Sequence, residues 1–140
     1  MVSPLASPGT RLLDPADIDA LSRWKLNTLN QTVGTIPAAV ITGGGAVVVL
    51  QTNATPGTQT TRTALQLFGD DPTSTIGGGY LLRISNSGAG TLTLAGGTNV
   101  TVTGTATVAT TTFRDFVVIY GGTLAVPTVT ITNIGTGTYS

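Results

Sequence analysis

Two adjacent carboxylates, Asp70 and Asp71, are the residues of this sequence whose chemistry is easiest to name. Together with backbone carbonyls they could bind a hard cation such as Ca²⁺. The segment Gly69-Asp-Asp-Pro72, however, has the composition of an ordinary turn, in which an aspartate hydrogen-bonds to its own backbone. The chain also contains no glutamate that could complete a bidentate shell. We therefore expect a turn at this position and no bound metal.

Other residue types on which enzymes depend are missing. The chain of 140 residues contains no histidine and no cysteine, which excludes zinc sites built on those ligands, thiolate nucleophiles and a Ser-His-Asp triad. Its single lysine, Lys25, is not part of a glycine-rich phosphate-binding motif. Glycan cleavage needs a pair of carboxylates, which six aspartates without any glutamate scarcely provide. The sequence therefore predicts a protein that is not an enzyme and uses no cofactor.

Charged residues make up only 9% of the chain, against about 25% in an average globular domain. Six basic and six acidic residues give a net charge of zero, so there is no basic patch for DNA or RNA. The longest apolar stretch, residues 36–50, is interrupted by a proline and three glycines and is too short to span a bilayer. We therefore expect neither nucleic acid nor a membrane as a partner.

Half of the charged residues lie within the first 30 residues. This segment therefore holds many of the side chains that could form ion pairs or charged hydrogen bonds with a partner. In this part of the chain, Asp14 and Pro15 suit the cap and the first turn of a helix. Apolar residues then recur at a spacing of three, as on one face of a helix. The sequence predicts an extended N-terminal arm over residues 1–35, with one short helix near 15–28.

The predicted helix is too short to be stable alone, so it needs a surface to pack on. This surface belongs either to a partner protein or to the chain's own β domain. Tryptophan and arginine, which are neighbours in the arm, are residue types often found as interface anchors. We take the partner as the working interpretation and expect these residues to bind it: Ile18, Leu21, Arg23, Trp24 and Lys25.

After residue 35 the periodicity changes to two. Threonines alternate with aliphatic residues in several segments, which is the pattern of half-buried antiparallel strands. Turns rich in glycine and proline separate these segments, and no helix is expected between them. The sequence predicts an all-β domain over residues 36–140, a sandwich or jelly-roll-like fold. Its strands are expected near 38–42, 46–52, 60–68, 80–85, 90–95, 99–109, 112–120 and 127–134.

Two runs depart from this alternation because they are apolar on both faces, Ala46-Val-Val-Val-Leu50 and Phe116-Val-Val-Ile-Tyr120. Such strands are either central in a sheet or covered by a neighbouring subunit. The β domain also has few of the charged side chains that usually protect sheet edges from pairing with other chains. We therefore expect an obligate oligomer, a homotrimer, that works inside a larger assembly.

Residues 91–104, TLTLAGGTNVTVTG, with residues 113–119, FRDFVVI, resemble a run that recurs in virion proteins of tailed bacteriophages. Residues 19–26, DALSRWKL, are similar to a stretch of some phage particle proteins. The resemblance implies a structural component of the particle: a capsid decoration (cement) protein, a head fibre or a tail appendage, commonly a trimer. The chain is short for a receptor-binding fibre and lacks a long repetitive shaft, which favours a decoration protein.

The function expected from the sequence is that of a non-enzymatic decoration protein on the capsid surface of the virion. Its partner would be the major capsid protein or another virion protein, and it would stabilise the shell as an oligomer. The alternative is a fibre or adhesin-type protein that binds a glycan or receptor on the host surface. Clustered exposed aromatic residues would favour that alternative, and the sequence shows none.

Overall fold

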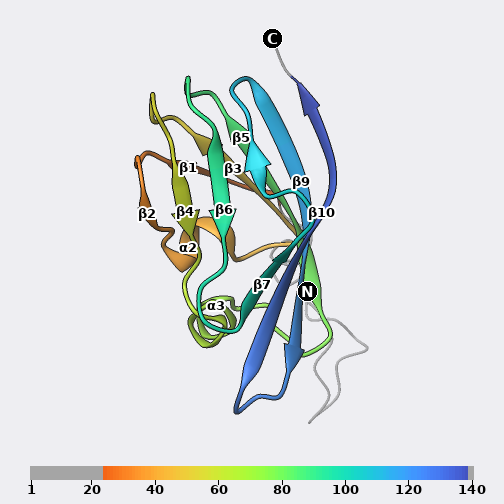
Figure 1. The fold of residues 1–140 in the computed structure, drawn as a ribbon. Helices are drawn as coiled ribbons and strands as arrows, with labels where there is room; N and C mark the ends of the chain where they lie inside the picture. Colours follow the sequence, from red (N-terminus) through yellow and green to blue (C-terminus); the bar gives the residue numbers. More distant parts are fainter. Residues whose placement is uncertain (1–23, 139–140) are drawn as a thin grey trace, which may run out of the picture.

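A computed structural model of the chain describes residues 24–138, which form an all-β sandwich of two sheets with two short helices (Figure 1). The larger sheet has six strands, in the spatial order β1 (Trp24–Leu29), β3 (Ala46–Gln51), β5 (Gly79–Asn86), β9 (Thr112–Gly122), β10 (Pro127–Thr138) and β7 (Val100–Thr103). The smaller sheet has four, in the order β2 (Gly34–Thr35), β4 (Thr58–Thr60), β6 (Leu92–Ala95) and β8 (Thr107–Val108). The predicted all-β sandwich is confirmed.

The first six strands alternate between the two sheets, so the chain winds around the core like a short parallel β-solenoid. In the larger sheet β1, β3 and β5 pair in parallel, and in the smaller sheet β2, β4 and β6 do the same. The threonine alternation predicted antiparallel strands, and this prediction is wrong for β6 in its pairing with β4 and for β7 and β10, which pair with each other in parallel. Parallel neighbours need a long crossover connection, and here the strand of the opposite sheet lies within each crossover.

The last third of the chain closes the sandwich with antiparallel pairs. β9 pairs with both β5 and β10, and β8 pairs with β6. β7 joins the far edge of the larger sheet by parallel pairing with β10. The turn between β9 and β10 extends beyond the helices at one end of the sandwich, as Figure 1 shows.

Two segments expected as strands contain helices. Residues 38–42 form α2 (Ala38–Ile41), which begins directly after Pro37. The segment 60–68 splits into β4 and α3 (Ala64–Asp70), because a capping box at its start favours a helix. In this capping box the Thr63 hydroxyl accepts the backbone N–H of Gln66, and the Gln66 side chain accepts the N–H of Thr63.

The predicted N-terminal arm ends earlier than expected. Residues 24–28, the end of the helix expected near 15–28, form β1, which pairs with β3 along its whole length. β2 likewise pairs with β4, so residues 24–35 belong to the two sheets and the boundary at residue 35 is wrong. The rest of the predicted helix lies outside the described residues.

The core lies between the two sheets and is built from alternate residues of the strands, together with the inner sides of α2 and α3. Its largest fully buried side chains include Phe116 and Tyr120 of β9. Three amide side chains, those of Gln51, Gln59 and Asn86, are also fully buried at the ends of the strands. Each is hydrogen-bonded to the backbone of a connecting loop. Because a buried polar group without a partner costs about 1–3 kcal/mol, these bonds fix the loops that join the sheets.

Candidate interaction surface

The structure separates the residues that were predicted to bind a partner. Ile18, Leu21 and Arg23 lie outside the described residues. Trp24 and Lys25 are neighbours in β1, and successive side chains of a strand point to opposite faces. Trp24 is 63% exposed on the outer face of the larger sheet, whereas Lys25 is half-buried and reaches across to α2. Trp24 and Lys25 therefore do not share one binding face.

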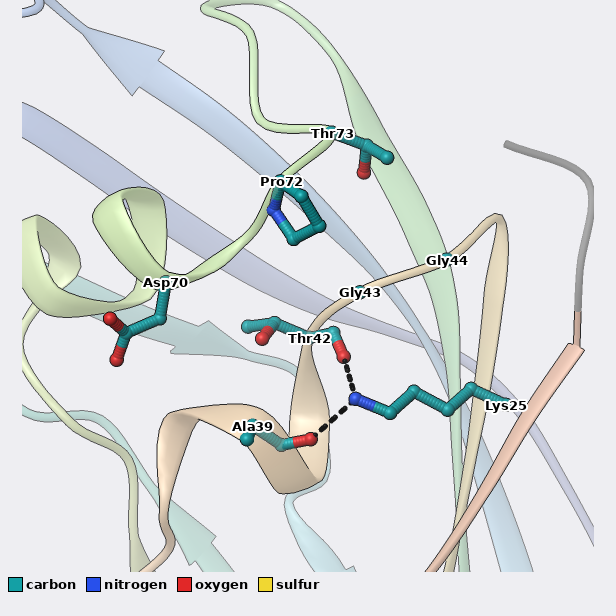
Figure 2. A pocket seen from close by; sticks show the side chains of 8 residues that line it. All are labelled: Lys25, Ala39, Thr42, Gly43, Gly44, Asp70, Pro72 and Thr73. Carbon is teal, nitrogen blue, oxygen red and sulfur yellow. Dashed lines mark hydrogen bonds between the residues drawn. The ribbon is translucent and has the colours of Figure 1, made fainter. Parts of the chain in front are cut away.

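Lys25 lines a pocket of about 330 Å³ between the start of β1, the end of α2 and the loop that follows α3 (Figure 2). Its ammonium donates hydrogen bonds to the backbone carbonyls of Ala39, at 2.7 Å, and Thr42, at 2.9 Å. These are carbonyls at the C-terminal end of α2, where a cation is favourable. Lys25 therefore caps the end of this helix.

The two adjacent aspartates have different environments. Asp70 is exposed and lines the same pocket as Lys25, and Figure 2 shows its carboxylate on the α3 side. Asp71 is only 3% exposed, and one of its carboxylate oxygens accepts the backbone N–H and the hydroxyl of Thr73, at 2.9 and 2.8 Å. This is the turn predicted from the sequence, with the aspartate bonded to the backbone two residues on.

The second carboxylate oxygen of Asp71 accepts the hydroxyl of Tyr120 at 2.5 Å. A second buried tyrosine, Tyr80, lies against Tyr120 and donates its hydroxyl to the carbonyl of Ile41. Burial raises the pKa of both tyrosines far above the ordinary value, and the nearby Asp71 carboxylate acts in the same direction on each. The two tyrosines are therefore neutral donors that connect β5 to the last residue of α2 and β9 to the loop after α3.

Within residues 24–138, no three side chains of histidine, cysteine, aspartate or glutamate come together as a metal site would require. In the same range, no helix has the length and apolarity that a membrane crossing needs.

The outer face of the larger sheet is the surface with the clearest chemical character. Pairing aligns Trp24, Ala46, Leu81 and Val117 in one row across β1, β3, β5 and β9. The row beside it begins with Leu26, which is 70% exposed, and Val48. We call the following side chains the apolar outer face: Trp24, Leu26, Val48, Leu50, Leu81 and Val117.

One ion pair completes this face. Arg83 of β5 and Asp115 of β9 are cross-strand neighbours, and their side chains form two hydrogen bonds, of 2.7 and 2.9 Å. The Arg83 guanidinium also lies 4.0 Å from the ring centroid of Phe113, and its bond to Asp115 raises its pKa further. The two charges neutralise each other, so the face presents no net charge to a partner.

Other outer surfaces of the sandwich are different. On the same sheet, β10 contributes Thr130 and Thr132 beside the apolar outer face. The outer side of the smaller sheet is formed largely by threonines of β4, β6 and β8, such as Thr58, Thr93 and Thr107. The apolar outer face is therefore a local feature of four strands, and hydroxyl-bearing side chains border it.

The sequence contained a signal for this surface. The run 46–50, apolar on both faces, supplies Val48 and Leu50, and the run 116–120 supplies Val117. The contributions of β1 were missed, because Trp24 and Leu26 had been placed on a helix.

No protein-family model matches the chain, and comparisons with curated proteins and with solved structures give no match.

Proposed function

We propose that this chain is a non-enzymatic structural protein of a tailed-bacteriophage particle, a capsid decoration protein that binds the capsid surface as an oligomer and stabilises the shell. The observation that supports this proposal best is the apolar outer face. Cores of protein interfaces are depleted in charge and enriched in aromatic residues. A domain that works alone usually protects such a face with charged side chains. The apolar outer face is therefore suited to lasting contact with protein.

The resemblance of residues 91–104 and 113–119 supports the proposal through segments that share only Val117 with the apolar outer face. Residues 91–104 contribute β6 and β7, and residues 113–119 lie in β9. These segments belong mainly to the scaffold, so they bear on the class of protein, and the apolar outer face bears on how it acts. Neither argument depends on the other.

Attachment to the capsid falls to the segment before β1 in this proposal. Residues 1–23 carry Ile18, Leu21 and Arg23, three of the residues expected to contact a partner. Lys25 is no longer assigned to this contact, because its ammonium is bonded to two carbonyls of its own chain. The partner is the major capsid protein or another protein of the virion, and the sandwich stays on the outside of the shell.

Binding to purified particles that lack the protein tests the proposal. The full chain should co-sediment with such particles, reach a fixed stoichiometry and raise the temperature at which they release their contents. The double variant Ile18→Ser/Leu21→Ser should bind at least about tenfold more weakly, which is about 1.4 kcal/mol. Leu124→Ser, a change in the exposed turn between β9 and β10, is the matched control and should bind normally.

Two results would contradict the proposal. If the chain does not bind particles but binds intact host cells, it is a fibre or adhesin-type protein, which is the alternative considered above. If it binds neither, a role in the virion is wrong.

A further inference from the structure

We infer that the apolar outer faces of two or three copies of this chain pack against one another around a symmetry axis. The inference names the surface through which the oligomer of the proposed function forms. It is tested on the purified chain without particles, so its failure is distinguishable from failure of the particle-binding proposal.

Charge indicates that the occupant is another copy. Arg83 and Asp115 are the charged residues on the outer side of β1, β3, β5 and β9, and they satisfy each other within one chain. Covering an ion pair that is already complete costs less than burying one charge without its partner, because each charge keeps its hydrogen-bonded counter-charge. An acidic or basic partner would find no complementary charge here. The same face of another copy is apolar and neutral, and closed symmetric oligomers are the usual form of self-association.

Geometry agrees with this assignment. The face belongs to one layer of a β-sandwich, and sheets without helices on their outer side pack face to face at about 10 Å. Four strands about 4.8 Å apart and five residues long give a flat footprint of roughly 320 Å², and the six-stranded sheet gives roughly 480 Å². Because side chains project from the sheet, its accessible surface area is larger than this flat footprint. A completely buried face therefore approaches the area of a standard interface, about 800 Å² per partner. The threonines of β10 and β7 then form the polar rim that such interfaces have.

The position of β1 at an edge of the larger sheet also favours association between copies. Among the described residues, β1 is an outer strand of the six-stranded sheet, and no other described strand pairs with its outer side. Lysine usually discourages pairing at such an edge, but Lys25 is turned toward α2. Trp24 and Leu26, both largely exposed, lie on this same strand. Association through the apolar outer face would cover both the side chains and the adjacent edge.

The single tryptophan makes the test direct. Trp24 is the only tryptophan of the chain and lies on the apolar outer face, so its emission reports whether that face is covered. Light scattering and fluorescence are measured together from nanomolar to high micromolar concentration. We expect an oligomer with blue-shifted emission at high concentration, and a shift to the red as the oligomer dissociates on dilution.

Variants identify the surface. Leu26→Lys places a charge on the apolar outer face and should weaken association at least about tenfold, or about 1.4 kcal/mol. Leu124→Lys changes a side chain of similar exposure, 74%, in the turn between β9 and β10, and should leave association unchanged. If Leu26→Lys does not fold by circular dichroism, Thr28→Lys replaces an exposed polar residue on the same side of β1 and serves in its place.

Three outcomes would overturn the inference. The wild-type chain stays monomeric at every concentration, or it forms an oligomer that the lysine on β1 does not weaken. In the third outcome, the oligomer dissociates on dilution, but Trp24 emission stays blue-shifted in the monomer. That result would mean that the chain's own residues cover the face.

Discussion

The hydrogen bond between Tyr120 and Asp71 should contribute more to stability than any other single side-chain contact in the core. Tyr120 is 2% exposed and Asp71 3%, and the distance between the hydroxyl and carboxylate oxygens is 2.5 Å. The substitution Tyr120→Phe removes only the hydroxyl. The ring keeps its edge-to-face contact with Phe68, at a centroid distance of 5.3 Å, so packing is preserved. What is lost is the donor to one oxygen of a buried carboxylate.

The expected magnitude follows from the charge of the acceptor. A hydrogen bond to a charged group contributes about 1.5–3 kcal/mol, against about 0.5–1.5 kcal/mol for a neutral pair. Both donors of Thr73 are already bonded to the other Asp71 oxygen, so Thr73 does not replace the lost hydroxyl. We expect Tyr120→Phe to lower the free energy of unfolding by about 2–3 kcal/mol. At about 2.1 cal/mol/K per residue of unfolding entropy, this lowers Tm by roughly 7–10 °C.

Tyr80→Phe is the matched control. Tyr80 is also buried, but its hydroxyl donates to a neutral backbone carbonyl, that of Ile41. Its loss should cost about 1 kcal/mol. Urea denaturation of both variants at one protein concentration gives the comparison, because association shifts apparent stability. In an Asp71→Asn background the cost of Tyr120→Phe should fall by about half. If Tyr120→Phe costs no more than Tyr80→Phe, the charge of the acceptor does not matter and the reasoning is refuted.

Three further predictions concern other parts of the fold. The two buried tyrosines stay neutral in the folded chain but ionise near pH 10 when it unfolds. Their contribution to stability should therefore be constant below that pH and fall above it by up to about 2.7 kcal/mol per pH unit. This slope should be absent from a variant with phenylalanine at both positions. Gly79→Ala should destabilise the fold by about 3 kcal/mol in thermal unfolding, because the added Cβ would lie 2.0 Å from a backbone carbonyl oxygen. Gly69→Ala should stabilise it by about 0.5–1 kcal/mol, because the added Cβ meets open space in α3. Lys25→Met should cost about 1 kcal/mol in urea denaturation through loss of the cap on α2, and Lys25→Arg should restore most of it.

Local patterns in the sequence predicted the strands whose two faces differ. The threonine alternation of β6, β7 and β10 corresponds to buried and exposed residues in turn, because one face of each strand lies on the core. The two runs that are apolar on both faces form most of β3 and the central part of β9, which are inner strands of the larger sheet. The helix α3 also had a local signal, a threonine and a glutamine three residues apart, but its residues were assigned to a strand.

The winding of the chain could not be predicted in the same way, because register between parallel strands is not a local property. Trp24 pairs with Ala46, 22 residues further on, whereas Ala46 pairs with Leu81, 35 residues further on. Each crossover contains a helix, but the helix and the loops of the second crossover are longer. Unequal crossovers conceal the repeat that stacked parallel strands usually leave in a sequence. Without a visible repeat, alternation of threonine and valine favoured antiparallel neighbours.

The sequence did not predict the candidate surface, because the segment that forms β1 was expected to be part of a helix. Spacing of three before Trp24 favours a helix, while Trp24 to Leu29 alternates as a strand would, so local pattern supports both. β3 decides between them, because it offers a six-residue ladder to this segment. A strand sends Trp24 and Lys25 to opposite faces, and this separates the two side chains that the sequence had grouped together.

The small number of charged residues can be interpreted by comparing the outer surfaces of the two sheets. A chain with 9% charged residues has little charge to keep it dissolved, so hydroxyl groups must provide most of its contact with water. Threonines lie on the outer side of the smaller sheet and of β10, whereas most side chains on the outer side of β1, β3, β5 and β9 are apolar and the two charged ones, Arg83 and Asp115, form an ion pair. The amino-acid composition alone does not predict that threonines and apolar side chains lie on different strands. Their separation onto different strands gives the sandwich one surface suited to solvent and one suited to contact with protein, which agrees with the oligomer proposed above.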